Sequence, residues 1–284
     1  MKYRHAFHAG NFADVHKHVT LVALFESLLR KDKGFLLVDT HAGSGIHDLG
    51  SAEARQSNEA ALGIERLLQD TQSANTPDIE QYLGLVRALR AESGHRHAYP
   101  GSPWIAARLL RAQDRAVLIE SQTDAFVELR RNLRDAAGCT FENGDGYARL
   151  PALLPPAEKR GLALIDPPYE DARQDQQRIA QSLERSLERF ATGVYAIWYP
   201  IKLERDVERW QANLVARLAR PMLSCELWLY PRDSRAGLNG SGMLIINPPY
   251  RFDEIARASL PRLVSALAPV PALGGWNVRD PSRA

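Results

Sequence analysis

The sequence predicts an α/β fold with a mostly parallel sheet, because short apolar runs of strand length recur along the chain. These runs lie at 35–38, 116–119, 162–165 and 194–198, and amphipathic helical patterns separate them. Three of the four are followed directly by Asp or Glu. In an open α/β sheet, ligands bind outside the carboxyl ends of the strands. The acidic residues at these strand ends therefore mark the candidate site.

Composition limits the class of protein. The 284 residues, 45% of them hydrophobic, fit one large α/β domain with an insertion. The net charge of +2 gives no overall positive field, so any nucleic-acid surface must be local. Cys139 and Cys225 form neither a disulfide framework nor a metal spacing, which favours a reducing compartment.

No apolar run approaches the ~18 residues that span a bilayer, and the N-terminus lacks the apolar core of a signal peptide. We therefore expect a cytoplasmic protein that does not associate with membranes. We also expect it to be a monomer.

The first element is a polar arm, residues 1–18, in which aromatic side chains alternate with basic ones. Tyr3 and Arg4 are suited to stacking on a base and contacting a phosphate, so we predict that both contact a nucleic acid. A helix is expected from about Ala13, with His18 near the ligand edge of the sheet. The histidines at 5, 8, 16 and 18, with Asp14, match no zinc spacing, so no metal site is predicted.

The strand at 35–38 leads into a glycine loop that ends at Gly45. Gly43 and Gly45 allow a tight turn against a ligand. A full dinucleotide fingerprint requires a third glycine, where this chain has Asp48. The loop is therefore a weak signal that gains weight only from its place after a strand.

Residues 49–102 interrupt the alternation of strands and helices. Two amphipathic helices are predicted, Ser57–Leu68 and Asp78–Leu89, with no buried strand. We interpret this stretch as an inserted helical subdomain, and residues 1–48 with 103–284 as the main domain. Ser102 precedes Pro103 and is predicted to cap the next helix, close to the glycine loop.

The strand at 116–119 ends in Glu120, and an acidic residue at this place typically accepts hydrogen bonds from a ribose. The alternative is an exposed charge without a ligand. A helix at 123–133 and a short strand at 139–142 follow. Asp145 could then accept from an adenine amino group, and Gly146 would allow close approach; the alternative for both is an ordinary turn.

The strand at 162–165 ends in Asp166-Pro-Pro-Tyr169, which is suited to a planar amine. Asp166 can accept from an N–H, Pro167 leaves its carbonyl free as a second acceptor, and Tyr169 offers a flat face for stacking. The motif resembles that of methyltransferases acting on exocyclic amines of nucleobases.

Helices are expected at 176–190, 202–218 and 253–267, and strands at 194–198, 222–230 and 242–246. The last strand ends in Asn247-Pro-Pro-Tyr250, a second motif of the same form. If that strand is antiparallel to the others, Asn247 lies at the opposite edge of the sheet, so we assign the chemistry to Asp166.

The motifs together are similar to those of the RlmJ family, bacterial enzymes that methylate the N6 of an adenine in large-subunit (23S) ribosomal RNA. The similarity includes Tyr3-Arg-His-x-Phe-His-Ala-Gly-Asn11, Asp14-Val-x-Lys-His18, Tyr99-Pro-Gly-Ser-Pro103 and Ile165-Asp-Pro-Pro-Tyr169. It implies a class I methyltransferase (Rossmann-like) fold with a seven-stranded sheet, and S-adenosylmethionine as methyl donor. The resemblance assigns the donor to His18, His41, Ser102, Glu120, Asp145, Gly146 and Asp166, to which we add Gly43, and it assigns RNA contact to Tyr3.

Two alternative functions stay open on the sequence. The same motif occurs in DNA adenine or cytosine amine methyltransferases, which would methylate duplex DNA. A non-catalytic RNA-binding protein on the same fold would not bind S-adenosylmethionine tightly.

Overall fold

The computed structural model describes residues 7–71, 74–234 and 237–283, and within them eight strands form one sheet. The strand order is β10-β8-β9-β7-β6-β1-β4-β5. The strands are β1 (Leu36–Asp39), β4 (Arg115–Glu120), β5 (Cys139–Asn143), β6 (Gly161–Ile165), β7 (Val194–Ile201), β8 (Met222–Trp228), β9 (Gly240–Ile246) and β10 (Gly275–Arg279). The expected α/β class is confirmed. The strand count is eight rather than seven, because the C-terminal tail adds β10 at the edge, paired antiparallel with β8.

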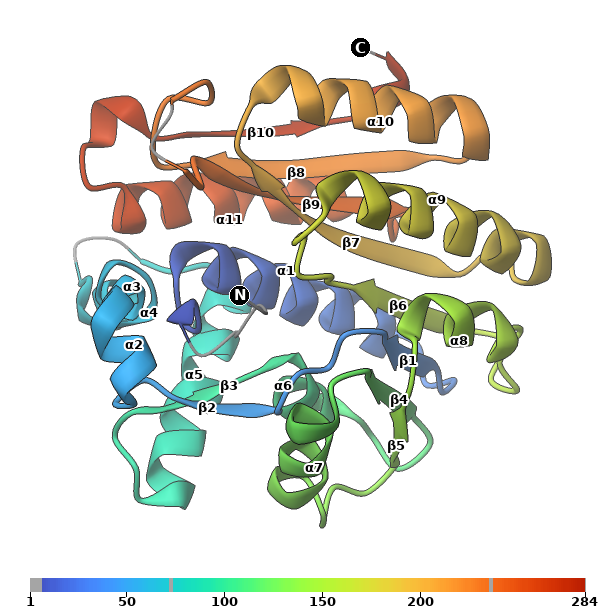
Figure 1. Ribbon diagram of the computed structural model, residues 1–284, viewed down its shortest axis with the longest axis horizontal. Helices are drawn as coiled ribbons and strands as arrows, with labels where there is room; N and C mark the ends of the chain where they lie inside the picture. Colours follow the sequence, from blue (N-terminus) through green and yellow to red (C-terminus); the bar gives the residue numbers. More distant parts are fainter. Residues whose placement is uncertain (1–6, 72–73, 235–236, 284) are drawn as a thin grey trace.

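Helices cover both faces of this sheet, as Figure 1 shows. They are α1 (Phe12–Leu29), α5 (Pro77–Ser93), α6 (Ser102–Leu109), α7 (Thr123–Asn132), α8 (Gly146–Ala152), α9 (Ala172–Arg189), α10 (Glu204–Leu218) and α11 (Phe252–Leu267). Two short 3₁₀ helices, Pro271–Leu273 and Pro281–Arg283, flank β10. No helix among the described residues is both long and apolar enough to cross a membrane.

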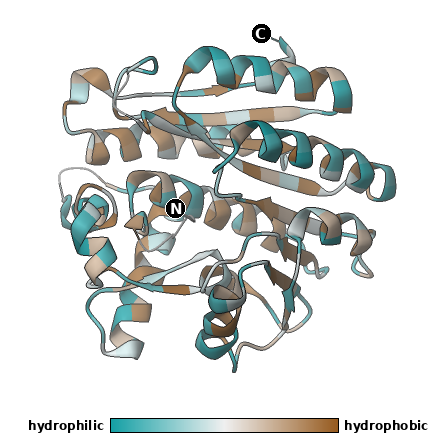
Figure 2. Cartoon of the chain, in the orientation of Figure 1, coloured by the Kyte–Doolittle hydropathy of each residue, from teal (hydrophilic) through white to brown (hydrophobic). Residues whose placement is uncertain are grey.

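Successive strand residues point to opposite faces, which produces two cores. On β6, Leu162 and Leu164 join the core beneath α1, α5, α6 and α11, whereas Ala163 and Ile165 join the core beneath α8, α9 and α10. Both faces of the strand are therefore buried, which explains its unbroken apolar sequence. Figure 2 shows the contrast between largely hydrophilic α9 and the hydrophobic stretches of the strands that it covers.

The strand order reverses between β1 and β6. From β1 the chain passes to β4 and β5 on one side, and it then returns to β6 and continues to β7 on the other. These five strands are parallel. A crevice outside the carboxyl ends of the strands at such a switch point is the usual ligand site of an open α/β sheet.

The helical insertion differs in detail from its prediction. It contains α2 (Ala52–Ser57), α3 (Glu59–Leu62), α4 (Ile64–Gln69) and α5. The predicted single helix Ser57–Leu68 is broken at Asn58, which has φ 54°, and at Gly63. The expectation of no buried strand was also wrong, because buried β3 (Ala98–Pro100) pairs with β2 (Ile46–Asp48). A strand of three residues is too short to show a period in the sequence.

Candidate active site

Asp166 and Pro167 follow β6 directly and lie at the switch point. The Asp166 side chain is 14% exposed, and its Oδ2 accepts a hydrogen bond of 2.5 Å from Lys17 Nζ. Within the described ranges no donor contacts Asp166 Oδ1 or the carbonyl oxygen of Pro167. The carboxylate and the adjacent carbonyl therefore offer two acceptors at this position, and their role toward a substrate amine stays a prediction.

Lys17 is the principal residue of the site that sequence reasoning missed. It lies on α1, is 5% exposed, and donates to Asp14 Oδ1 at 2.8 Å as well as to Asp166. Burial lowers the pKa of Lys17, but the carboxylates of Asp14 and Asp166 outweigh burial and hold that pKa above its usual value. The ammonium occupies one oxygen of Asp166 and leaves the other for a ligand.

Tyr169 closes the motif with a backbone φ of 51°. Its hydroxyl donates to the Trp198 carbonyl at 2.8 Å, and its ring meets the Trp198 ring edge-on with centroids 5.7 Å apart. The residue is only 7% exposed. Stacking of a base on Tyr169 stays a prediction, and it would use the ring face turned away from Trp198.

Asp39, at the end of β1, was not among the predicted site residues, yet it is fully buried at the switch point. The Ser102 hydroxyl donates to Asp39 Oδ2 at 2.7 Å. Ser102 therefore binds Asp39 instead of capping α6, whose cap position is Gly101. Burial raises the pKa of Asp39 to about 7, partly offset by the hydrogen bond from Ser102.

Glu120 and Gly43 lie together. Glu120 Oε2 accepts from the Gly43 backbone N–H at 2.8 Å, and Oε1 accepts from the Gln122 N–H at 2.7 Å. Glu120 is 7% exposed, so it is not an ordinary surface charge. Gly43 has φ +62°, and a Cβ built there would meet nothing within 4 Å. The glycine loop thus borders open space beside an oriented carboxylate.

Asp145, Gly146 and His41 meet where α8 begins. Asp145 caps α8 by accepting from the Tyr147 N–H and pairs with Arg178 at 2.5 Å. A Cβ on Gly146 would lie 2.0 Å from the Thr40 carbonyl oxygen, so α8 touches the loop after β1. The His41 ring lies edge-on to Tyr147 with centroids 4.8 Å apart. Burial and nearby Arg178 lower the pKa of His41 to about 3, which keeps the imidazole neutral.

The N-terminal histidines have separate partners. His18 Nδ1 is 3.0 Å from the Tyr99 hydroxyl, His16 Nδ1 is 2.9 Å from Ser241 Oγ, and His8 Nδ1 is 3.0 Å from Glu59. Among the residues that the structure describes, no group of three or more His, Cys, Asp or Glu could hold a metal ion. The predicted RNA contacts Tyr3 and Arg4 lie outside the described residues.

Asn247 lies at the other edge of the sheet, because β9 is antiparallel to both β7 and β8. Its amide donates to the carbonyls of Ala191 and Gly193 at 3.0 and 2.8 Å. The second motif is therefore a structural connection in which Asn247 ties β9 to the turn before β7.

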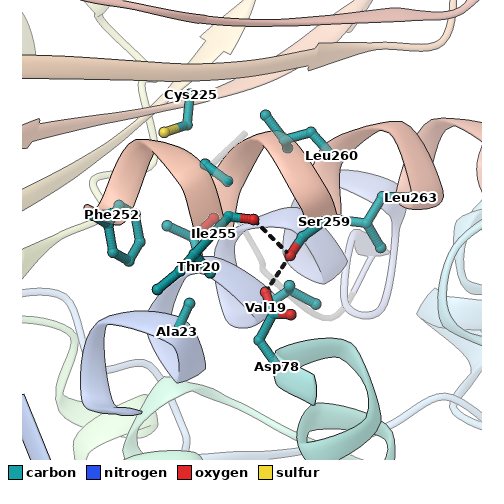
Figure 3. Close-up of a pocket in the computed structure, with 11 residues that line it drawn as sticks. Val19, Thr20, Ala23, Asp78, Cys225, Phe252, Ile255, Ser259, Leu260 and Leu263 are labelled. Carbon is teal, nitrogen blue, oxygen red and sulfur yellow. Dashed lines mark hydrogen bonds between the residues drawn. The ribbon is translucent and has the colours of Figure 1, made fainter. Parts of the chain in front are cut away.

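A small cavity lies within the core between α1, α11 and β8, shown in Figure 3. Its lining is mostly apolar and includes Val19, Phe252 and Leu260, and the Ser259 hydroxyl donates to buried Asp78. The cavity encloses about 10 Å³, which is room for one water at most. It is a gap in packing and not a substrate site.

The residues at the switch point fit S-adenosylmethionine. Gly43 borders open space, Glu120 presents an oriented carboxylate for a ribose, and neutral His41 lies against Tyr147 in the same loop as Gly43. Asp166 and Pro167 supply acceptors for an amine next to this space. Transfer of a group to a planar amine is the chemistry that the arrangement suits best.

Comparison with known proteins gives consistent matches. The family described as "Ribosomal RNA large subunit methyltransferase D, RlmJ" matches residues 32–280. The chain is 40% identical to ribosomal RNA large subunit methyltransferase J of Haemophilus influenzae, over 98% of both chains, and 42% identical to the protein of that name from Escherichia coli K12, over 95% of both. The crystal structure of protein LPL1258 from Legionella pneumophila has a TM-score of 0.87 at 32% identity, over 96% of this chain and 98% of that one.

Proposed function

This chain belongs to the RlmJ family of ribosomal RNA large subunit methyltransferases, and we propose that it transfers a methyl group from S-adenosylmethionine to the exocyclic N6 of a specific adenine in 23S ribosomal RNA. The observation that carries the assignment to an amine is a pair of acceptors at the switch point, Asp166 Oδ1 and the Pro167 carbonyl, that no donor of the described residues contacts. Such a pair matches the two hydrogens of an amino group.

The chain must overcome the low nucleophilicity of N6, whose lone pair is delocalised into the adenine ring. Asp166 and the Pro167 carbonyl would each hold one N6 hydrogen, which turns the lone pair out of the ring plane toward the methyl group. The carboxylate would also stabilise the positive charge that develops on N6 and take the proton that N6 loses, while the bond from the methyl group to sulfur breaks and a neutral thioether leaves. S-adenosylmethionine supplies a methyl group on a sulfonium centre, which is already a good leaving group. Positioning therefore accounts for much of the rate.

The donor would be held along the carboxyl ends of β1, β4 and β6. The residues assigned to it are His18, His41, Gly43, Ser102, Glu120, Asp145, Gly146 and Asp166. Glu120 would accept from the ribose hydroxyls, because its carboxylate already has a fixed orientation beside Gly43. Asp145 would accept from the adenine of the donor through a second lone pair of one oxygen, because Oδ1 already accepts from the Tyr147 N–H and Oδ2 already accepts from Arg178.

The target base must leave its stack to reach Asp166. Tyr169 would replace a lost stacking partner, and Tyr3 and Arg4 would contact the RNA beside it. The net charge of +2 favours a defined RNA element over general duplex binding, since few phosphates can be neutralised. A cytoplasmic location and a monomeric state stay predictions.

The alternatives are less well supported. The relatives that match nearly the whole chain are named as ribosomal RNA methyltransferases. These names argue against a DNA methyltransferase and against a non-catalytic RNA-binding protein.

The test is methyl transfer from labelled S-adenosylmethionine to 23S ribosomal RNA and to duplex DNA, followed by mapping of the modified nucleotide. We expect label in one adenine of the RNA, at N6, and none in DNA. Label in DNA, or S-adenosylmethionine binding without transfer to RNA, would contradict the proposal.

A further inference from the structure

The helical insertion binds the segment that leads into α1. Glu59, the first residue of α3, contacts His8 Nδ1 with both carboxylate oxygens, at 3.0 and 3.1 Å. Glu59 Oε2 also accepts from Asn11 Nδ2 at 2.8 Å. The Ser57 hydroxyl donates to the Phe7 carbonyl. Residues 57–59 thus contact segment 7–11 along its length, and Figure 1 shows α2–α4 beside the N-terminal end of α1.

Backbone contacts fix the register between the two segments. The Ile64 N–H donates to the Gly10 carbonyl at 2.8 Å. A Cβ on Gly63 would lie 2.1 Å from the Gly10 carbonyl oxygen, and Gly10 itself has φ +76°. Because the two backbones touch without intervening side chains, a shift of the insertion relative to segment 7–11 would require this contact to break.

Segment 7–11 is connected in turn to the site. The Asn11 side chain caps α1 by accepting from the backbone N–H groups of Ala13 and Asp14, both at 2.9 Å. The Gly10 N–H donates to Asp14 Oδ2 at 3.0 Å, and Asp14 Oδ1 accepts from Lys17. A continuous path of polar contacts therefore runs from Glu59 through Asn11, Asp14 and Lys17 to Asp166.

The inner part of this path has little freedom to rearrange. Asn11, Asp14 and Lys17 are 6%, 4% and 5% exposed, so each buried polar group needs the partners it has. Glu59 and His8 lie at the partly exposed end, and the hydrogen bond that the His8 ring donates to Glu59 raises the pKa of His8. Glu59 itself touches neither Lys17 nor Asp166 among the contacts of the described residues.

We propose that Glu59 is a positioning residue for methyl transfer: by holding segment 7–11 it fixes the first turn of α1, and through Asp14 and Lys17 it fixes the orientation of the Asp166 carboxylate. This gives the helical insertion a part in catalysis without contact with the reacting atoms. The expected effect on kcat rests on the proposed function. The structural link from Glu59 to α1 does not depend on the proposed function.

The test compares Glu59→Ala with Glu65→Ala. Glu65 lies in the same insertion, one residue after Ile64, but its carboxylate forms an ion pair of 2.5 Å with Arg90 and, among the contacts of the described residues, binds no residue of segment 7–11. We expect Glu59→Ala to lower kcat for RNA methylation about tenfold, with the KM for S-adenosylmethionine changed less than twofold. Glu65→Ala should leave kcat within twofold of wild type. Glu59→Gln, whose amide oxygen still accepts one hydrogen bond, should recover part of the loss.

Amide hydrogen exchange gives a readout that does not require activity. Exchange at Ala13 and Asp14, whose N–H groups bind the Asn11 cap, should become faster in Glu59→Ala and stay unchanged in Glu65→Ala. Circular dichroism corrects kcat for the folded fraction. An unchanged kcat in Glu59→Ala, an equal loss in Glu65→Ala, or a loss without faster exchange at α1 would each overturn the proposal. If wild type methylates no RNA, the proposed function fails, and exchange alone decides whether Glu59 fixes α1.

Discussion

At the scale of single residues, burial has a clear effect on the carboxyl group of Asp39. It is fully buried, it accepts from Ser102, and it lies near the carboxylate of Asp166. Burial disfavours the ionised form, and the pKa of Asp39 is raised to about 7. Asp39 therefore binds its proton more tightly in the folded than in the unfolded chain, where the pKa is about 4.

The raised pKa of Asp39 predicts that the free energy of unfolding depends on pH. The substitution Asp39→Asn, which has no proton to titrate, should remove this dependence. Between about pH 4 and pH 7 the folded state binds more protons, so stability from this group falls as pH rises through that window. At about 1.4 kcal/mol per pKa unit, the free energy of unfolding of Asp39→Asn minus that of wild type should increase by up to about 4 kcal/mol across the window. Urea unfolding at several pH values measures it, and a difference that does not vary with pH would contradict it.

A strand end helped to identify candidate site residues but was not sufficient, because Asp39 also follows an apolar run and was missed. Asp166 and Glu120 could be found because each ends an apolar run. Lys17 could not be found, because its partner Asp166 lies 149 positions away and only the packing of α1 brings the two together. Ser102 was found, but its contact was predicted wrongly, because the local sequence favours a cap and only the tertiary structure provides Asp39 as an acceptor.

At the scale of elements, α8 packs closely against the loop after β1, which carries residues that we assign to the donor. Gly146 begins α8 and leaves no room for a side chain against Thr40, whereas neighbouring Gly144 has open space around it. The loop after β1 carries His41 and Gly43, so the position of α8 is tied to two residues assigned to the donor.

Gly146→Ala should therefore weaken binding of the methyl donor and lower the free energy of unfolding. The new Cβ, 2.0 Å from the Thr40 oxygen, must push α8 or the loop aside, at a cost of about 1–3 kcal/mol in stability. We expect the Kd for S-adenosylmethionine to rise at least tenfold by calorimetry. Gly144→Ala, the matched control, should change neither quantity appreciably. If the two substitutions change stability and the Kd for S-adenosylmethionine by similar amounts, the close packing of α8 against Thr40 does not determine donor binding.

Elements with an unbroken apolar run or a long helical pattern were predictable, and strands without such a pattern were not. The helix after Ala13 and the strands at 35–38 and 162–165 occur close to their expected bounds. Strand β10 was missed because Gly275–Arg279 has little apolar character and becomes a strand only by pairing with β8. The break at Asn58 depends on a left-handed backbone that asparagine tolerates but does not require.

At the scale of the whole molecule, strand direction separates two motifs of nearly identical sequence. Asp166 follows a parallel strand at the switch point, and Asn247 follows an antiparallel strand and lies at the far edge. The same residue pattern thus has a catalytic assignment in one place and a structural role in the other. The central claim is that methyl transfer takes place at the edge that holds Asp166.

The most direct test compares methylation of 23S ribosomal RNA by Asp166→Ala and Asn247→Ala, each normalised to folded protein. We expect Asp166→Ala to lose at least about 10²-fold in kcat, since an acceptor for developing charge is removed. Asn247→Ala should keep wild-type kcat. It should lose about 1–3 kcal/mol in stability, because two carbonyls lose their donor and alanine must adopt φ 54°. An active Asp166→Ala variant together with a folded but inactive Asn247→Ala variant would contradict the account.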